Sequence, residues 1–326
     1  MARQKKIVTE YRNYSLPIQF PVLLLHGDYW KISDVPSGRL HFHNCLEIGL
    51  CHSDSGTMEV LGYPFSFRSG DVTVIPRNVP HTTYSAKGYE SHWSYLFFDP
   101  QELFRNLIPT SWANSDLTNN SLNNFKYIYS KDEYPTLYFL MESIIRELSM
   151  QQPFYKISAK GLLLSLYTEL YRLQNIEHDK KQEQLSIDSP VAENALVISP
   201  ALNYIECNYM HQFSIEQLAD LCHWSPTHFR RVFHEIMNTS PLEYINDTRI
   251  KKSCTLLRST EHSVLDISGM VGFHSVSSYN RCFFKTLKMS PSEYRKQMLL
   301  SDKKAENSSI LEYTGWMFPE KFTHGS

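Results

Sequence analysis

The sequence predicts an α+β protein in which a β-rich N-terminal domain precedes an all-helical C-terminal domain. Three observations support this prediction. A set of motifs near the C-terminus occurs twice at a fixed spacing, which indicates one structural unit used twice. Short apolar runs separated by turn residues fill much of the first hundred positions, which is typical of a β-barrel or β-sandwich. Between these regions, apolar residues recur at helical spacing.

The repeated motifs lie between residues 213 and 294, at an offset of fifty positions. Each copy is predicted to form a helix, a tight turn and a second helix. In the first copy, Ser214 and Gln217 have the spacing of a capping box, and Ser225-Pro226 restarts the chain as the second helix. In the second copy, Gly272 is expected to make the turn. The matched motifs are Arg231-Val-Phe233 with Arg281-Cys-Phe283, and Ser240-Pro241-x-Glu243-Tyr244 with Ser290-Pro291-x-Glu293-Tyr294.

A third helix is predicted between the two copies, from Ser240-Pro241 to about Arg258. At about 1.5 Å per residue, this helix is a rigid spacer of roughly 27 Å. Successive major grooves on one face of B-DNA lie about 34 Å apart. The spacer therefore suits a pair of recognition helices that face one side of a duplex.

Over about residues 196–298, these motifs resemble the DNA-binding domain of the AraC/XylS family of transcription regulators. The resemblance implies two helix-turn-helix units and double-stranded DNA as a partner. Two residues before each Ser-Pro, where the family usually has glycine, this chain has Asn238 and Lys288, which must then adopt a left-handed conformation. The resemblance assigns base contacts to Thr227, Arg230, Arg231, Ser277, Asn280 and Arg281.

The overall charge says little about partners. The 326 residues carry a formal net charge of −2, and residues 196–300 hold eleven Lys or Arg against nine Asp or Glu. The prediction of a DNA partner therefore depends on the repeat. The six cysteines form no CxxC pair, and no signal-like segment or apolar run of about 20 residues is present, which favours a cytoplasmic protein with no membrane association.

A histidine-rich pattern lies in the predicted β-domain. His41-x-His43-x-x-x-Glu47, followed by His81 five residues after Pro76, resembles the two motifs of the cupin family, which in metal-binding members supply three histidines and a glutamate. The donor set suits a divalent metal, but polar residues that line a small pocket more often bind an effector or one another. On a straight strand Glu47 would lie about 13 Å from His43, so we expect the chain to bend near Asn44.

The family resemblance also implies a small-molecule effector inside a cupin-like barrel, with a carbohydrate as the expected class. In sugar-sensing members, a tryptophan on a late strand stacks on the sugar, and Trp93 matches that position. An aromatic face supplies contact area while polar groups fix orientation. No cofactor is predicted apart from the open question of the metal. The predicted effector-binding residues are His41, His43, Glu47, His81 and Trp93.

Two apolar runs at helical spacing follow the β-domain, from Leu137 to Leu148 and from Leu162 to Leu173. Such helices can cover the open face of the barrel, and the family resemblance implies that they also pair in a homodimer. Residues 1–12 are expected to be a loose arm. The predicted segments are a cupin-like effector-binding domain (1–133), a helical dimerisation segment (134–173), a linker (174–195), a double helix-turn-helix DNA-binding domain (196–300) and a C-terminal tail (301–326).

The leading hypothesis is a transcription regulator whose cupin-like domain senses a small molecule and modulates operator binding, with RNA polymerase as a further partner. One alternative is a DNA-binding regulator whose vestigial barrel only dimerises. The other is a metal-dependent cupin enzyme that uses His41, His43, Glu47 and His81. Because an enzyme has no use for a pair of helix-turn-helix units, we expect no enzymatic activity.

Overall fold

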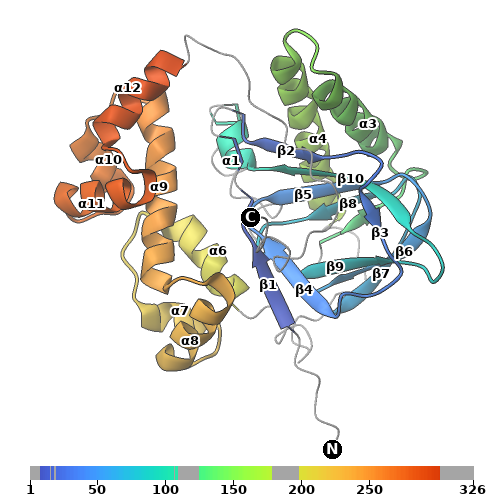
Figure 1. Ribbon diagram of the computed structural model, residues 1–326, viewed down its shortest axis with the longest axis horizontal. Helices are drawn as coiled ribbons and strands as arrows, with labels where there is room; N and C mark the ends of the chain where they lie inside the picture. Colours follow the sequence, from blue (N-terminus) through green and yellow to red (C-terminus); the bar gives the residue numbers. More distant parts are fainter. Residues whose placement is uncertain are drawn as a thin grey trace, which may run out of the picture. The chain divides into compact units, whose positions relative to one another are not determined.

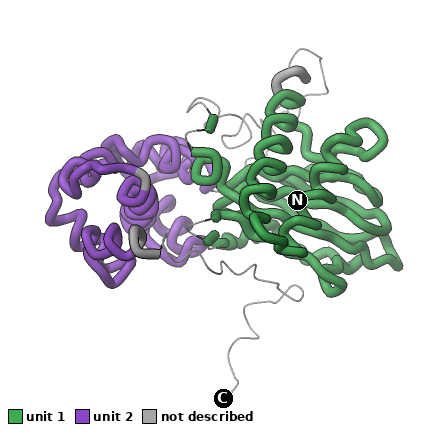
Figure 2. Tube along the Cα trace, turned by 90° about the horizontal axis from the view of Figure 1, so that it is seen from above, with its two compact units in different colours: residues 1–196, 308–326 green, residues 197–307 purple. Residues whose placement is uncertain are grey.

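The computed structural model describes residues 8–14, 16–17, 20–105, 107–108, 125–177 and 198–301. Its internal contacts divide the chain into two compact units, with the boundary between residues 196 and 197 (Figure 2). The apolar stretch at 310–322 and positions 178–195 of the predicted linker lie outside the described residues.

The strands of the first unit form two sheets in the described part of the chain (Figure 1). One sheet has the order β1-β4-β9-β6-β7, and the other has the order β11-β8-β5-β10-β2, with β3 also paired to β10. The strands are β1 Val8–Arg12, β2 Val22–Leu25, β3 Lys31–Ile32, β4 Arg39–His43, β5 Leu46–Cys51, β6 Ser55–Val60, β7 Tyr63–Arg68, β8 Val72–Ile75, β9 His81–Ser85, β10 Ser91–Phe98 and β11 Ile128–Tyr129.

Apolar side chains from both sheets share one core. Leu40 of β4 and Met58 of β6 belong to the same buried cluster as Ile48 of β5 and Trp93 of β10. Strand residues that alternate with these point to the other face of each sheet. The arrangement confirms the prediction of a cupin-like β-domain.

The first strand differs from the sequence-based expectation of a loose arm. Residues Val8–Arg12 pair in parallel with β4, so that Glu10 lies beside His41. The ring of Tyr11 packs against Phe42, with centroids 5.2 Å apart. Residues 8–12 are too polar to show the apolar alternation of a buried strand. They can be polar because they form an edge strand, and other strands of the sheet supply its buried core.

In the described part of the first unit, three helices follow β10: α1 Pro100–Leu103, α3 Pro135–Met150 and α4 Tyr155–Glu177. The buried faces of α3 and α4 join the core of the sheets, as predicted for helices that cover the barrel. Helix α4 continues through Glu177, whereas the sequence analysis begins the linker at residue 174. The polar Gln174 is buried, and its amide donates a 2.6 Å hydrogen bond to the Tyr129 hydroxyl.

The described residues of the second unit form helices joined by short turns and loops, with no strand among them (Figure 1). No helix in the described ranges is long and apolar enough to span a membrane. The two predicted helix-turn-helix units are α7 with α8 and α10 with α11, joined by α9. The helices are α6 Ser199–Asn208, α7 Ile215–Leu221, α8 Pro226–Met237, α9 Pro241–Ser259, α10 Val264–Met270, α11 Val276–Leu287 and α12 Pro291–Ser301.

The helix boundaries follow the predicted capping signals. Ser214 and Gln217 form a capping box at α7, and the side chain of Ser225 caps α8. Asn238 and Lys288 end α8 and α11 with φ angles of 53° and 57°, which confirms their predicted left-handed conformation. At such a position Lys288 is more strained than a glycine would be.

The tight turns inside the two helix-turn-helix units are made by different residues. Gly272, with φ 89°, makes the turn between α10 and α11, and an added Cβ would come within 2.7 Å of the Tyr209 carbonyl oxygen. His223, with φ 55°, has the corresponding position between α7 and α8. A glycine is therefore required in the second turn but not in the first.

Candidate functional site

The six predicted base-contacting residues lie on the second helices of the two helix-turn-helix units. All six side chains are exposed, while the opposite face of each helix is buried through Phe229 and Phe233 on α8 and through Tyr279 and Phe283 on α11. The structure therefore places both predicted sets on outward-facing surfaces. On α8 these residues are Thr227, Arg230 and Arg231, and on α11 they are Ser277, Asn280 and Arg281.

The two arginines of α8 each have an acidic neighbour. The Arg231 guanidinium Nη1 lies 2.7 Å from Glu235 Oε1, and its Nη2 lies 3.2 Å from His228 Nδ1. Arg230 Nη2 lies 3.5 Å from Glu216 Oε1 on α7. All of these groups are largely exposed, so the pairs orient the arginines without contributing much to stability.

Helix α11 is instead tied to the start of α9. Lys285 Nζ donates a 2.9 Å bond to Glu243 Oε1, and the Thr286 hydroxyl donates a 3.1 Å bond to Asp247 Oδ1. The bond from Lys285, together with the backbone and side chain of Ser240, lowers the pKa of Glu243 to about 2. The carboxylate of Glu243 thus caps α9 and fixes α11 against it.

Two buried or half-buried arginines, which the sequence analysis did not identify, hold the helices in place. Arg249 donates to the carbonyl oxygens of Tyr209 and His211 at 2.8 and 3.0 Å. Arg295 repeats the arrangement in the second copy, with bonds of 3.1 and 2.6 Å to the carbonyl oxygens of Leu257 and His262. A guanidinium suits this role because its fixed fork of N–H groups matches two acceptors.

The predicted effector residues of the first unit come together only because the chain bends. Strand β4 ends at His43 and β5 begins at Leu46, with the bend at Asn44 and Cys45. His43 Nε2 lies 2.9 Å from Glu47 Oε2, and His81 Nε2 lies 3.6 Å from the same oxygen. The ring of His41 is 4.2 Å from that of His81, centroid to centroid. The bend predicted near Asn44 is therefore confirmed.

The hydrogen bonds that His43 and His81 make on the side away from Glu47 leave the cluster without a positive charge to balance the carboxylate. The carbonyl oxygens of Cys45 and Val79 lie 2.9 Å from the Nδ1 atoms of His43 and His81, so each Nδ1 carries the hydrogen. A neutral ring then directs the lone pair of its Nε2 toward the Glu47 carboxylate. One proton or one cation is needed to relieve the repulsion among these electron pairs.

The pKa values are consistent with an anionic glutamate among poorly protonated rings. Burial lowers the pKa of His41 well below its ordinary value and also lowers that of His43. For Glu47, burial alone raises the pKa, but the attraction and hydrogen bonding that His81 and His43 supply when a ring carries both hydrogens outweigh burial and lower the pKa. Glu47 is thus the negative centre of the cluster.

The donor set fits a divalent transition-metal ion. His41, Glu47 and His81 can each place a ligand atom within 4.8 Å of the other two. Imidazole nitrogen and carboxylate oxygen suit zinc, nickel or iron. The carbonyl oxygens behind His43 and His81 act as the outer partners that commonly orient metal-binding histidines.

The predicted stacking residue, Trp93, is fully buried in the sheet that carries Glu47, whereas the three histidines lie on strands of the other sheet. Its ring is stacked on Tyr95 at 5.4 Å and meets the edge of Phe67 at 4.8 Å, and its Nε1 donates to the Ser91 hydroxyl. Gly49 of β5 makes room for this stack, because an added Cβ would lie 3.0 Å from the Tyr95 ring. A ligand that stacks on Trp93 must therefore displace one of these rings.

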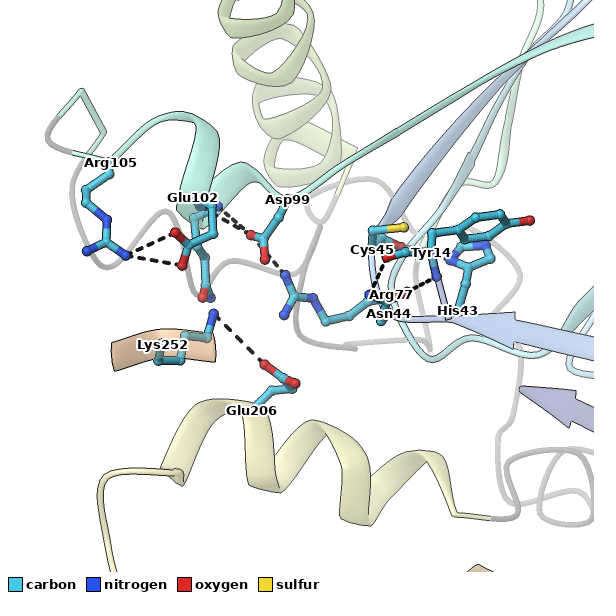
Figure 3. Close-up of polar contacts among 11 residues, drawn as sticks. Tyr14, His43, Asn44, Cys45, Arg77, Asp99, Glu102, Arg105, Glu206 and Lys252 are labelled. Atoms are coloured by element: carbon cyan, nitrogen blue, oxygen red, sulfur yellow. Dashed lines mark hydrogen bonds and ion pairs between the residues drawn. The ribbon is translucent and has the colours of Figure 1, made fainter. Parts of the chain in front are cut away.

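The segment after β1 packs near the histidine cluster. The backbone of Tyr14 exchanges two hydrogen bonds with the Asn44 side chain, at 2.8 and 3.0 Å (Figure 3). The ring of Tyr14 lies 4.2 Å from that of Phe97. Nearby, the buried Arg77 lies 3.2 Å from Asp99, which caps α1 (Figure 3). These contacts hold the bend and the loop after β8 in place.

Comparison with known proteins decides the family. The ligand-binding domain of AraC-like proteins matches residues 34–167, and a helix-turn-helix domain matches residues 218–297. The chain belongs to the AraC family of transcription regulators. In this AraC-family chain the histidine cluster lies within the ligand-binding match, and both recognition helices lie within the helix-turn-helix match.

Two relatives by sequence are named as HTH-type transcriptional regulators. An uncharacterised HTH-type transcriptional regulator of Bacillus subtilis, YdeC, is 32% identical over 35% of this chain and 39% of its own length. The putative HTH-type regulator YkgA of Escherichia coli is 34% identical over 33% of this chain and 47% of its own length. The matches to both relatives thus span less than half of their length. A solved AraC-type regulator from Chromobacterium violaceum is 24% identical over 31% of this chain and 90% of that chain, with a TM-score of 0.30.

A separate cleft of about 450 Å³ lies beside β6, β7 and β9 of the ligand-binding domain. Its charged and hydroxyl-bearing lining includes Asp34, Ser55, Thr57, Tyr84 and Lys87. None of the five predicted effector residues lines this cleft. The sequence analysis did not identify it, because these residues come from loops and strand edges without a recognisable motif.

Proposed function

We propose that this AraC-family chain binds double-stranded DNA by placing α8 and α11 in successive major grooves. The observation that carries the proposal is the exposure of all six predicted base-contacting residues on two equivalent helices. The 19 residues of α9 correspond to a spacer of about 28 Å, which is close to the distance of about 34 Å between neighbouring grooves.

The link between the recognition helices supports simultaneous binding. The pairs Lys285–Glu243 and Thr286–Asp247 join α11 to α9, while Arg249 fixes α9 to the segment before α7. A rigid pair of helices loses less conformational freedom on binding than two independent ones. We therefore expect both units to contact one operator site.

We further propose that a small polar ring molecule, with a carbohydrate as the expected class, binds in the barrel and changes operator affinity. The cluster around Glu47 offers hydrogen-bond partners of fixed orientation, and Trp93 offers an aromatic face once Tyr95 or Phe67 moves. A ligand that requires this opening favours one arrangement of the domain over another, and such differential affinity is the source of allosteric coupling.

A homodimer is proposed through α3 and α4. Large apolar side chains are exposed along these helices, although most side chains of this kind are buried elsewhere in the unit. A second copy of the chain would remove them from water. The exposed side chains are Phe139 and Met150 of α3, Phe154 before α4, and Ile157 of α4.

Selection of binding sites from random-sequence DNA by the purified full chain tests the proposal. We expect enriched sequences to contain two short specified blocks about one helical turn apart. Absence of enrichment would contradict DNA recognition. Repeating the selection and the affinity measurement with a panel of sugars tests the sensor separately: unchanged affinity with every sugar, alongside specific DNA binding, would support the vestigial barrel instead.

A further inference from the structure

An exposed phenylalanine lies on α11, the second recognition helix. Phe284 is 59% exposed, whereas the preceding Phe283 is fully buried. Among the described residues, Phe284 belongs neither to the buried cluster around Phe283 nor to the partly buried side chains that pack on this cluster. The core of the second helix-turn-helix unit therefore does not use the Phe284 ring.

Phe284 shares the outward face of the predicted base-contacting residues on α11. With about 3.6 residues per turn, it lies about one turn after Arg281 and about two turns after Ser277. Viewed along the helix, its direction falls between those of Asn280 and Arg281, and all of these residues are exposed. The fully buried rings of α11 lie on the opposite face. A surface that brings Arg281 to DNA therefore brings Phe284 to it as well.

The bonds between α11 and α9 fix the backbone that carries Phe284. The next two residues of the helix, Lys285 and Thr286, each donate a side-chain hydrogen bond to α9, at 2.9 and 3.1 Å. An aromatic side chain with only two rotatable bonds loses little conformational freedom when it is ordered at an interface. The Phe284 ring is thus held ready for contact before DNA binds.

The chemistry of the ring limits what it can recognise in a major groove. A phenyl ring has neither a charge nor an N–H or O–H donor, so it is poorly suited to phosphate oxygens and to the polar edges of the bases. Thymine differs from the other three bases because it presents an apolar C5-methyl group in the major groove. Contact between the ring and this methyl group removes apolar surface of both from water. A thymine methyl group is therefore the matching partner for an exposed phenylalanine on this face.

The corresponding position of the first unit has a different chemistry. Fifty positions before Phe284 the residue is His234, which is also exposed. An imidazole can donate and accept hydrogen bonds, so His234 is suited to polar partners. The two recognition helices should therefore differ in sequence preference, with an apolar contact at this position of α11 and a polar one at the same position of α8.

We propose that Phe284 contacts the 5-methyl group of a thymine in the major groove occupied by α11 and is a specificity-determining residue of this chain. The inference rests on the proposed binding of α11 in a major groove. It adds to the six polar residues of the recognition helices one residue that selects a base through its apolar surface. Deoxyuridine differs from thymidine by this methyl group alone and is therefore the discriminating probe.

Replacement of thymine by deoxyuridine tests the proposal, because it removes the methyl group and keeps every hydrogen-bonding atom of the base. Each thymine of the operator obtained by selection is replaced singly, and the affinity of the full chain for each duplex is measured. We expect the parent chain to lose about fourfold in affinity at one thymine, which is the effect of one buried methyl group. The Phe284→Ala variant should bind the thymine and deoxyuridine duplexes equally at that position, which completes a double-mutant cycle.

Two control variants separate the ring contact from other effects. Phe284→Leu keeps an apolar side chain and should retain part of the discrimination, and His234→Ala, at the matched position of α8, should retain all of it. Because Phe284 is exposed, Phe284→Ala should unfold close to the parent's temperature. A thymine preference that survives Phe284→Ala, or a parent chain indifferent to every replacement, would overturn the inference and leave DNA recognition intact. A parent chain that selects no sequence would overturn both.

Discussion

Arg231 and Glu235 lie one turn apart on α8, with the guanidinium Nη1 2.7 Å from the carboxylate Oε1. Fifty positions later the corresponding residues are Arg281 and Lys285, and Lys285 is paired with Glu243 of α9. Within residues 198–301, Arg281 has no ion-pair partner. The two recognition helices therefore have the same fold, but the surroundings of their arginines differ. The Arg231 guanidinium is oriented by a carboxylate, whereas the charge of Arg281 is not offset by an ion pair within residues 198–301.

Replacement of Arg231 by alanine tests the role of the oriented arginine. If Arg231 contacts a base edge, the variant should lose about 1–3 kcal/mol of binding free energy and relax the preference at one base pair. The measurement is affinity for a selected operator and for its set of single-base variants. A uniform loss on every sequence would assign Arg231 to a phosphate contact instead.

Arg281→Ala and Glu235→Gln complete this comparison. Arg281 forms no ion pair within residues 198–301, so its removal should reduce the salt dependence of binding more than Arg231→Ala does. Glu235→Gln removes the group that orients Arg231 and should weaken sequence preference while leaving non-specific binding unchanged or stronger. Equal salt slopes for the two arginine variants would contradict the proposed difference between the helices.

Insertion of five base pairs between the two contacted grooves should strongly reduce affinity. The insertion turns one groove through about half of a helical turn, and α9 with its bonds to α11 cannot follow that rotation. An insertion of ten base pairs restores the face but not the distance, so it should also weaken binding. Undiminished affinity for the five-base-pair insertion, measured by titration, would mean that a single helix-turn-helix unit contacts the DNA.

Some of these features could be predicted from the sequence because local chemistry determines them. The capping residues, the bend near Asn44 and the left-handed Asn238 and Lys288 each follow from a few neighbouring residues. The exposed faces of α8 and α11 follow from apolar periodicity. In each case the physical cause lies within one or two helical turns or within one strand.

Features that depend on sheet order could not be predicted. His26, His52 and His92 meet only because β10 lies between β2 and β5, and no sequence spacing marks them. The pairing of β1 with β4 and the burial of Gln174 also depend on distant partners. The stacking of Trp93 on Tyr95 depends on how the core packs, and the number of aromatic residues in the sequence does not predict it.

Acidification should destabilise the ligand-binding domain between about pH 7 and pH 5. Burial lowers the folded-state pKa of His41 and His43 below the ordinary value of 6.5, so below that pH the unfolded chain binds more protons than the folded one. The free energy of unfolding therefore decreases as the pH is lowered, by at most about 1.4 kcal/mol per pH unit for each histidine. Urea unfolding in the presence of a chelator measures this slope.

His41→Asn provides the matched variant for the pH measurement, because it keeps a polar side chain that does not titrate. Its slope between about pH 7 and pH 5 should be smaller than that of the parent chain. Glu47 acts in a different window: its lowered pKa contributes stability above its ordinary value of 4.5, and this contribution is lost as the pH falls further. Identical slopes for the two proteins would contradict the assignment to His41.

The sensor is tested by variants that remove the proposed pocket while the DNA-binding domain is kept. Trp93 is fully buried, so Trp93→Ala should lower the free energy of unfolding by about 3–5 kcal/mol. Trp93→Phe keeps an aromatic ring and much of the volume, and is the variant expected to remain folded.

With the effector found by selection, Trp93→Phe should weaken the response and His81→Ala should abolish it, because His81 is one of the polar groups that would orient the ligand. Operator affinity without effector should stay that of the parent. A full response in both folded variants would show that the histidines only satisfy one another and would move the search for the effector to the cleft between Asp34 and Lys87.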